Sequence, residues 1–309
     1  MIEVQRLTKT YGSEKAVNEI SFGVKKGEVL GFLGPNGAGK TTTMKVITCY
    51  LPPSAGTVKV DGMDVRNDSM AIRRRIGYLP EHTPLYHDMT TYDYLSFVAE
   101  MRGVSPKDVS GAIAKMAAVC GLGSVLNKRI EALSKGYRQR VGLAQAMIHD
   151  PDIVILDEPT SGLDPNQIVE IRELIKGIGT EKTVILSTHI LPEVQASCDR
   201  VLIIHRGQLV ADGTPDDLKA SFAGAQQLKF GIQNASADVA EALKAWGKVN
   251  ISSQEALDNA ETLFTLTSEE KSDLRPELYN LAVKNKWTLT ELHRDQANLE
   301  DVFRQLTSN

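Results

Sequence analysis

The first two-thirds of the chain predict an α/β fold with a mostly parallel central sheet. Short β-branched runs alternate with helix-like stretches, and these runs are apolar on both faces. Strands of this kind suit a sheet that is covered on both sides, as parallel sheets are. The runs are Val29–Leu33, Ile153–Leu156, Val184–Ser187 and Val201–His205. The segment Thr57–Val60 is more typical of an antiparallel edge.

A helical subdomain is predicted over about residues 84–140, between two of these strands. Thr90 followed by Asp93 fits a capping box, in which a hydroxyl accepts a backbone N–H at the start of a helix. Ala112–Val119 continues the helical pattern, and Gly121 interrupts it. The pattern therefore favours at least two helices in this segment.

The composition changes around Ala220–Gln227, where the residues become small and polar, and we interpret this segment as a linker. It separates a domain over residues 1–220 from a small C-terminal α+β domain over residues 221–309. The expected order in the second domain is β-α-β-β-α-β, which fits a ferredoxin-like sandwich. Strands are expected at 228–232, 249–253, 262–267 and 287–292, helices at 237–246 and 274–283, and a closing helix at 299–306.

Length and composition are ordinary for a globular protein. The 309 residues allow one large core and a smaller second domain, and 42% hydrophobic with 24% charged residues is a common balance. The formal net charge of -4 gives no sign of a basic face, so no nucleic-acid partner is expected. The 3 cysteines show no CxxC pairing, which indicates packed, reduced thiols of a cytosolic protein.

We expect neither a targeting segment nor a membrane-spanning helix. The N-terminal sequence MIEVQRLTKTYG carries charge early and has no apolar region of a secretory signal. The longest apolar runs include Ile153–Leu156 and Val201–Ile204, and a membrane-spanning helix needs about 20 apolar residues. The chain is therefore not expected to cross a bilayer itself.

A phosphate-binding loop is predicted where GPNGAGKT matches the pattern G-x-x-x-x-G-K-[ST] between a strand and a helix-like stretch. The glycines let backbone N–H groups close around an anion, and the helix N-terminus adds a partial positive charge. Lys40 is expected to face the β- and γ-phosphates, and Thr41 to offer its hydroxyl to Mg²⁺. The expected cofactors are ATP and Mg²⁺. The candidate ligands are Gly34, Pro35, Asn36, Gly37, Ala38, Gly39, Lys40, Thr41 and Thr42.

Two carboxylates follow the apolar run Ile153–Leu156, namely Asp157 and Glu158. In an open α/β sheet, ligands lie off the carboxyl ends of the strands. Asp157 is therefore placed to hold Mg²⁺, directly or through water. Glu158 is placed to polarise the attacking water as a general base, a role that is typically worth about 10²–10⁴ in rate.

Several further motifs, in a fixed order, resemble those of the ABC ATPases. Leu133–Tyr137 (LSKGY) resembles the signature, Ser161–Asp164 (SGLD) resembles the D-loop, and Ser187–His189 resembles the switch-histidine loop. Tyr11 precedes the phosphate loop where the family keeps an aromatic residue that stacks on adenine. The resemblance covers about residues 1–220. It implies a P-loop ABC nucleotide-binding domain with a parallel core sheet, an antiparallel edge and a helical subdomain.

The resemblance also implies a dimer. In ABC proteins the signature contacts the γ-phosphate that is bound by the partner subunit, and Ser134 and Gly136 match the residues that do so. Asp164 lies in the matching D-loop, and His189 joins Lys40 and Glu158 as a catalytic residue. ATP then bridges two subunits and favours the closed dimer, and hydrolysis removes the bridge. The partner is either a second copy of the chain or a paralogue.

The chain departs from the usual family pattern at three positions. Glu81 stands where the family usually has Gln; its carboxylate can still offer Mg²⁺ an oxygen but cannot donate an amide N–H. The expected metal ligands are therefore Thr41, Glu81 and Asp157. The signature has Lys135 and Tyr137 where Gly and Gln are commonest.

These variants, with GYLPE at 77–81 and LEDVF at 299–303, resemble the ABC-2 exporter branch. That branch includes drug- and antibiotic-resistance ATPases and gliding-motility-associated ATPases. The resemblance implies the ATPase subunit of an exporter whose transmembrane permease is a separate polypeptide. It also implies a cytoplasmic chain that is peripheral on the inner face of the cell membrane. Four residues are candidates either for the groove that meets the permease or for internal packing, namely Leu85, Tyr86, Met89 and Tyr94.

Two other functions are compatible with parts of the sequence. One is a non-transport ABC ATPase that acts as a switch on nucleic acid or ribosomes, and the other is a regulatory module that binds nucleotide without turnover. The segment between Lys40 and Leu133 is too short for the long coiled coil of DNA-repair members, and the chain has one cassette where translation-acting members have two. The presence of Glu158 and His189 argues for turnover.

Overall fold

The computed structural model of the chain describes residues 1–222, 226–257, 260–268, 270, 272–295 and 299–307. It divides into two compact units, Met1–Pro215 with the described residues from Leu306, and Asp216–Gln305. We call them the N-terminal unit and the C-terminal unit. The expected linker is only partly visible, because residues 223–225 lie outside the described residues. Helix α8 (Pro215–Phe222) occupies the start of the expected linker and strand β11 its end.

A six-stranded sheet forms the centre of the N-terminal unit. Its neighbouring strands are parallel, apart from the antiparallel pair of β10 and β9. The four strands expected from apolar runs all belong to it, so the predicted parallel core is confirmed. The order is β10 (Gln208–Gly213), β9 (Arg200–His205), β3 (Val29–Leu33), β8 (Thr183–Thr188), β7 (Ile153–Asp157) and β6 (Ile76–Leu79).

The predicted edge segment Thr57–Val60 belongs to β4, which is antiparallel to its neighbours as expected. It lies in a separate four-stranded sheet, because the long β1–β2 hairpin supplies its own pairing partners. The order of that sheet is β2 (Glu14–Val24), β1 (Ile2–Tyr11), β4 (Ala55–Val60) and β5 (Met63–Asp64). Buried residues of both sheets, such as Val4 and Phe32, share one hydrophobic core.

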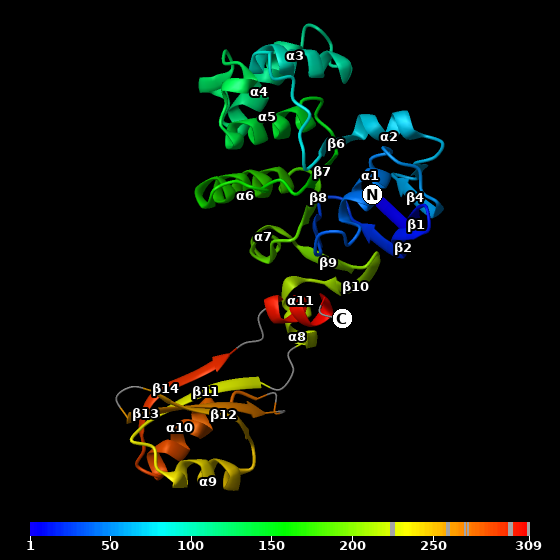
Figure 1. Cartoon of the computed structure of the whole chain (residues 1–309). Coiled ribbons are helices and arrows are strands. Elements are labelled where there is room, and N and C mark those ends of the chain that lie inside the picture. Colours follow the sequence, from blue (N-terminus) through cyan, green and yellow to red (C-terminus); the bar gives the residue numbers. More distant parts are fainter. Residues whose placement is uncertain (223–225, 258–259, 269, 271, 296–298, 308–309) are drawn as a thin grey trace. The chain divides into compact units, whose positions relative to one another are not determined.

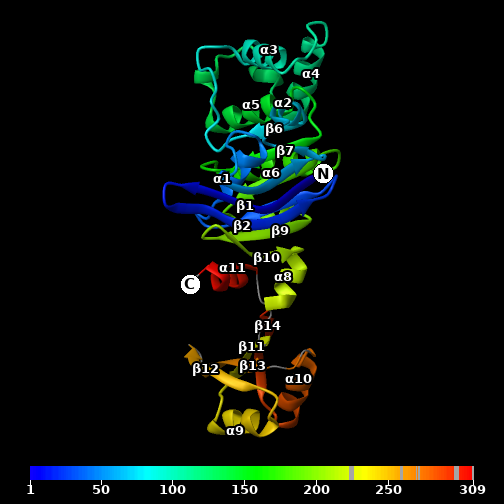
Figure 2. The same cartoon turned by 90° about the vertical axis from the view of Figure 1, so that its right-hand side faces the viewer.

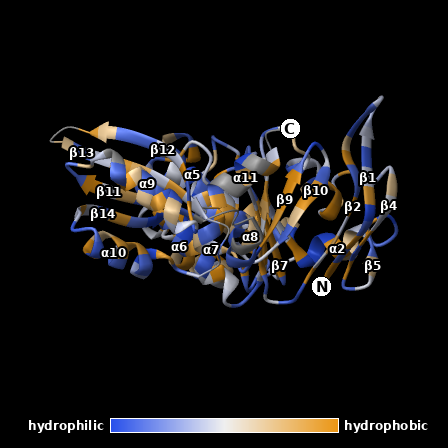
Figure 3. Ribbon diagram, turned by 90° about the horizontal axis from the view of Figure 1, so that it is seen from below, coloured by the Kyte–Doolittle hydropathy of each residue, from blue (hydrophilic) through white to orange (hydrophobic). Residues whose placement is uncertain are grey.

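Helices cover both faces of the central sheet. Figure 1 shows α6 (Pro165–Gly179) and α7 (Leu191–Ser197) on one side, and α1 (Lys40–Ile47) on the other. Figure 3 shows the strands of this sheet, such as β9, coloured as hydrophobic. This pattern explains why their sequences are apolar on both faces. Helix α2 (Ser69–Arg75) leads into the outer strand β6.

The helical subdomain gathers at one end of this unit (Figures 1 and 2). It contains α3 (Thr91–Met101), α4 (Val109–Cys120) and α5 (Lys135–Met147), with short 3₁₀ turns at Gly123–Val125 and Ile130–Ala132. Thr90 caps α3 as predicted, since its hydroxyl accepts the Asp93 N–H at 3.1 Å. Gly121 ends α4 in the left-handed region with φ of 66°, a conformation that glycine adopts without strain.

The C-terminal unit is a four-stranded antiparallel sheet with helices α9 and α10 packed on one face (Figure 1). Its sheet order confirms the predicted ferredoxin-like topology. Among the described residues, no helix is long and apolar enough to span a bilayer. The sheet order is β12 (Asn250–Leu257), β13 (Glu261–Ser268), β11 (Gln226–Gln233) and β14 (Thr288–Asp295). The two helices on this sheet are α9 (Ala237–Trp246) and α10 (Arg275–Lys284), and the expected closing helix forms as α11 (Leu299–Thr307), whose residues from Leu306 are assigned to the N-terminal unit.

Candidate nucleotide-binding site

The phosphate loop connects β3 to α1, and close backbone packing requires two of its glycines, Gly34 and Gly39. Gly39 has φ of 107°, and a Cβ there would lie 2.5 Å from the Ala16 carbonyl oxygen of β2. A Cβ on Gly34 would clash with the Ile204 carbonyl of β9. Strands β2 and β9 therefore hold the loop from two sides, and only glycine fits at these two points.

Lys40 is 6% exposed and points back into the loop that precedes it. Its ammonium donates to the carbonyl oxygens of Gly34 at 2.7 Å and Pro35 at 3.2 Å. It also forms an ion pair with Glu158, with 3.2 Å between Nζ and Oε1. The loop thus folds around one buried cation, whose charge is available to an anion at the helix N-terminus.

Asp157, at the end of β7, is fully buried and accepts three side-chain hydrogen bonds. Its Oδ1 accepts from Thr41 Oγ1 at 3.2 Å and from Ser187 Oγ at 2.5 Å, and its Oδ2 accepts from the Tyr78 hydroxyl at 3.4 Å. Burial, together with the negative charge of Asp157, raises the pKa of Tyr78 well above its usual range. The fold thus brings into contact Thr41 and Asp157, two of the three residues predicted to hold Mg²⁺.

Glu158 lies between Lys40 and His189. Its backbone has φ of 51°, and its N–H donates to the Ser187 carbonyl oxygen at 2.9 Å. One carboxylate oxygen faces Lys40, and the other lies 2.9 Å from His189 Nδ1. This left-handed conformation is uncommon for a residue with a side chain, and it occurs here at a predicted catalytic position.

The loop that carries His189 is anchored by a buried carboxylate that the sequence patterns did not identify. Glu193 is 1% exposed and accepts hydrogen bonds from the hydroxyls of Thr160 and Thr188, the second at 2.8 Å. Thr188 in turn accepts the Ile190 N–H at 3.0 Å. Glu193 therefore links the loop after β7 to the loop after β8. Its position in a short helix gives no sequence signal of this role.

The signature turn begins α5. Ser134 caps this helix by accepting the Tyr137 N–H at 3.3 Å, and a Cβ on Gly136 would lie 2.7 Å from Gln167 Cδ. Asp164 caps α6 by accepting the Gln167 N–H at 3.0 Å. Among the described residues, no hydrogen bond or ion pair joins Ser134 or Gly136 to the phosphate loop.

Other predicted ligands lie apart from this cluster. Tyr11 ends β1, is 49% exposed, and has the Lys9 ammonium 5.6 Å from its ring centroid. Glu81 is exposed in the bend after β6. Within the described part of the chain, no group of three His, Cys, Asp or Glu residues is arranged to hold a metal ion. The contribution of Glu81 to a metal site therefore stays a prediction. Asn36 is exposed and Thr42 is half-buried.

Comparisons with known proteins agree with this geometry. The family model described as "ABC transporter" matches residues 17–161. The ABC transporter ATP-binding protein NatA of Bacillus subtilis is 41% identical, over 67% of this chain and 85% of NatA. The chain belongs to the family of ABC transporter ATP-binding proteins.

Two further likenesses concern the whole chain and the fold. The Nod factor export ATP-binding protein I of Burkholderia orbicola is 34% identical, over 99% of this chain and 96% of that protein. The chain spans only 39% of a probable multidrug ABC transporter ATP-binding protein, YbhF of Escherichia coli, with 39% identity. A dimeric, post-hydrolysis structure of the cassette MJ0796 bound to ADP and Pi has a TM-score of 0.64 and 25% identity, and covers 69% of this chain and 98% of that one. The predicted fold, that of an ABC ATP-binding cassette, is therefore confirmed.

Proposed function

We propose that the chain binds and hydrolyses ATP as the cytoplasmic subunit of an ABC-2 type exporter, with a separate transmembrane permease. The observation that carries this proposal is the buried contact of Lys40 with Glu158, which also contacts His189. A regulatory module without turnover has no need for this arrangement. Relatives that match the chain over nearly its full length carry names of export or resistance proteins, such as the linearmycin resistance protein LnrL of Bacillus subtilis.

Nucleotide binding is assigned to residues 34–42 and Tyr11. The backbone N–H groups of the loop and the Lys40 ammonium bind the phosphates, and Tyr11 stacks on the adenine. On binding, Lys40 exchanges its contacts with the Gly34 and Pro35 carbonyl oxygens for phosphate oxygens. Since these carbonyl groups already compensate the buried charge, the cation is held in place before ATP arrives.

The donor set around Asp157 fits Mg²⁺. A buried carboxylate and a hydroxyl are oxygen ligands of the kind this ion takes, and the two lie in contact here. Thr41 and Asp157 hold the ion, with Glu81 as a third oxygen donor. When bound, Mg²⁺ neutralises phosphate charge and orients the phosphates.

Glu158 acts as the general base that orients and deprotonates the attacking water, and His189 holds its carboxylate through Nδ1. The strained backbone of Glu158 and the Glu193 anchor fix both side chains relative to the phosphate loop. Ser134 and Gly136 act on the nucleotide of a partner subunit, and Asp164 positions the D-loop beside that contact. Two copies of the chain, or one copy and a paralogue, complete the site.

The surface that meets the permease is assigned to a groove of about 800 Å³ between α2 and α3. Two of the four candidates, Tyr86 and Tyr94, line this groove, and Tyr94 is also a buried member of the helical subdomain's core. Leu85 and Met89 instead pack in the core of the helical subdomain. The rest of the lining combines three arginines with apolar and uncharged polar residues. These lining residues are Met70, Arg73, Arg74, Pro84, Phe97, Val98, Met101, Arg102, Gly103, Gln145 and His149.

The proposed function predicts that the purified chain releases phosphate from ATP when Mg²⁺ is present. It also predicts co-purification with a multi-span membrane protein, to be sought first among the products of the neighbouring reading frames. Phosphate release without co-purification contradicts the exporter role and retains the ATPase. Absence of phosphate release, from the chain alone and from the complex, contradicts the proposal as a whole.

A further inference from the structure

The outer strand β6 brings an aromatic side chain next to the carboxylate assigned to the metal site. Strands β6 and β7 are parallel, and Tyr78 pairs with Ile155. Asp157 lies two residues beyond Ile155 and therefore projects from the same face of the sheet. A tyrosine is long enough to reach such a diagonal neighbour. The Tyr78 hydroxyl accordingly donates to Asp157 Oδ2 at 3.4 Å.

With this hydrogen bond, both carboxylate oxygens of the buried Asp157 have a donor. Thr41 and Ser187 both donate to Asp157 Oδ1, whereas Tyr78 is the one side chain, among the described residues, that donates to Oδ2. Asp157 has 0% of its surface exposed. A buried carboxylate oxygen without a donor is unfavourable, so the phenol fixes the orientation of this carboxylate.

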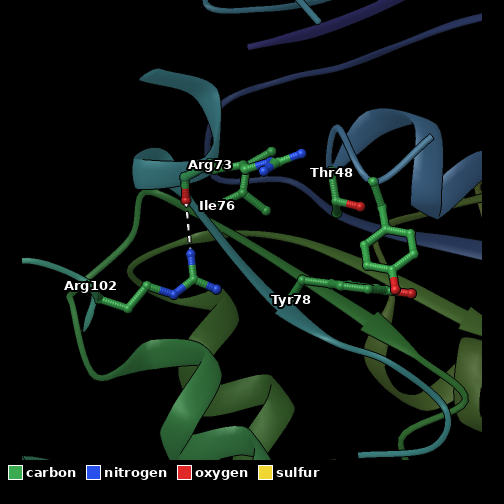
Figure 4. A pocket seen from close by; sticks show the side chains of 6 residues that line it. Thr48, Arg73, Ile76, Tyr78 and Arg102 are labelled. Carbon is green, nitrogen blue, oxygen red and sulfur yellow. Dashed lines mark hydrogen bonds between the residues drawn. The ribbon is translucent and has the colours of Figure 1, made fainter. Parts of the chain in front are cut away.

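The same tyrosine reaches a pocket on the side that faces α2 and α3. A pocket of about 310 Å³ is lined by Thr48, Tyr50, Arg73, Ile76, Tyr78 and Arg102. Figure 4 shows Arg102 and the hydroxyl end of Tyr78 on opposite sides of it. Arg73 and Arg102 also line the larger groove that we assign to the permease. Arg102, at the end of α3, connects this helix to α2 by donating to the Arg73 carbonyl oxygen at 3.1 Å.

We propose that Tyr78 is a positioning residue that orients Asp157 for Mg²⁺ and links this carboxylate to the groove through the pocket that Arg73 and Arg102 share with it. The inference rests on the proposed function, because it needs Asp157 to hold the metal. A shift of Arg102 at the groove alters the pocket against which Tyr78 packs. Such a change is transmitted to the Asp157 carboxylate through the single hydrogen bond from Tyr78.

Tyr78→Phe tests the inference, because it removes the hydroxyl and keeps the ring. Tyr50→Phe is the matched control, since Tyr50 lines the same pocket and has no hydrogen bond to Asp157. The readout is Mn²⁺ binding, measured by electron paramagnetic resonance on the chain saturated with a non-hydrolysable ATP analogue. We expect Tyr78→Phe to weaken Mn²⁺ binding about tenfold, the lower end for loss of a group that supports a metal ligand. Tyr50→Phe is expected to stay within about twofold of wild type.

A second substitution separates the donor from the packing. Replacement of Tyr78 by p-aminophenylalanine returns an N–H donor at the same place, and we expect it to recover most of the lost Mn²⁺ affinity, even if Tyr78→Phe lowers the melting temperature. Equal Mn²⁺ affinity in wild type and Tyr78→Phe overturns the inference, as does failure of the amine to rescue. If wild type itself binds the ATP analogue but no Mn²⁺, the assignment of Asp157 fails first, so the two failures are distinguishable.

Discussion

In the N-terminal unit, charged side chains are buried where the strands of the central sheet end. Lys40, Asp157, Glu158 and Glu193 are each between 0% and 6% exposed. Among the described residues of the C-terminal unit, the ion pairs lie at the surface, as in the 2.8 Å contact of Lys248 with Glu277. Buried charges are retained only where other groups compensate their desolvation, whereas exposed pairs contribute little. The contrast indicates that the N-terminal unit carries the chemistry, and the experiments below test it from the largest expected effect to the smallest.

The largest effect is expected for Glu158→Gln. The amide keeps the shape of the side chain but cannot accept a proton from water. We expect the ATP hydrolysis rate to fall about 10²–10⁴-fold, the usual contribution of a general base, while ATP binding persists and dimers accumulate. Phosphate release and gel filtration with ATP measure the two effects. A turnover rate equal to that of wild type shows that Glu158 is not the base.

An intermediate effect is expected from His149, which lines the groove of the N-terminal unit. Burial, followed by the charge of Arg102, lowers the pKa of His149 from 6.5 to about 4. Between these two values the His149 side chain takes up a proton in the unfolded chain but not in the folded chain. The free energy of unfolding is therefore highest above pH 6.5 and decreases as the pH falls from 6.5 towards 4. The expected loss in free energy of unfolding between pH 7 and 5 is about 1–2 kcal/mol, after allowance for solvent screening.

The two units are distinguishable in this measurement, because both tryptophans, Trp246 and Trp287, lie in the C-terminal unit. Circular dichroism in urea should show the transition of the N-terminal unit moving to lower urea at pH 5, and His149→Gln should reduce that movement. The fluorescence transition should move less, because the hydrogen bond from the Arg275 guanidinium lowers the pKa of Asp273 to about 2, so this pair stays ionised at pH 5. If the urea transition of the N-terminal unit moves equally with pH in wild type and in His149→Gln, protonation of His149 is not the cause of the loss in stability.

The smallest effect is expected at Lys248. Its ammonium lies 5.9 Å from the Trp246 ring centroid and pairs with Glu277 at the surface. Lys248→Ala should shift the fluorescence emission of the chain and leave the urea midpoint of the C-terminal unit unchanged. A large drop in that midpoint would show that an exposed charge stabilises the C-terminal unit strongly, which contradicts the contrast drawn between buried and exposed charges.

The sequence was sufficient for features that are encoded within one segment. Thr90 with Asp93 predicted the start of α3, and the phosphate-loop pattern predicted the loop between β3 and α1. Asp157 could be assigned because the end of a parallel strand marks a ligand edge. In the C-terminal unit, alternating runs and turn residues were enough for the order of strands and helices. In each case the signal and the structure it specifies lie within a few residues of one another.

What the sequence did not reveal depends on contacts between distant segments. Tyr78 reaches Asp157 through the register of β6 on β7, and Glu193 binds Thr160 and Thr188 through the packing of α7. The composition of a segment does not encode such a register. Leu85 and Tyr86 are neighbours with large side chains that were both candidates for the groove, yet Leu85 is buried and Tyr86 lines the groove.

The central claim is that the phosphate loop of one copy and the signature of another share one nucleotide. Lys40→Ala removes the cation of the loop, and Ser134→Arg blocks the signature, so neither variant alone forms a complete site. In a mixed dimer the intact loop of the second variant faces the intact signature of the first. We predict that equal amounts of the two variants hydrolyse ATP when mixed, although each alone does not. Mixtures that stay as inactive as the separate variants, while ATP-dependent mixed dimers form, contradict the account.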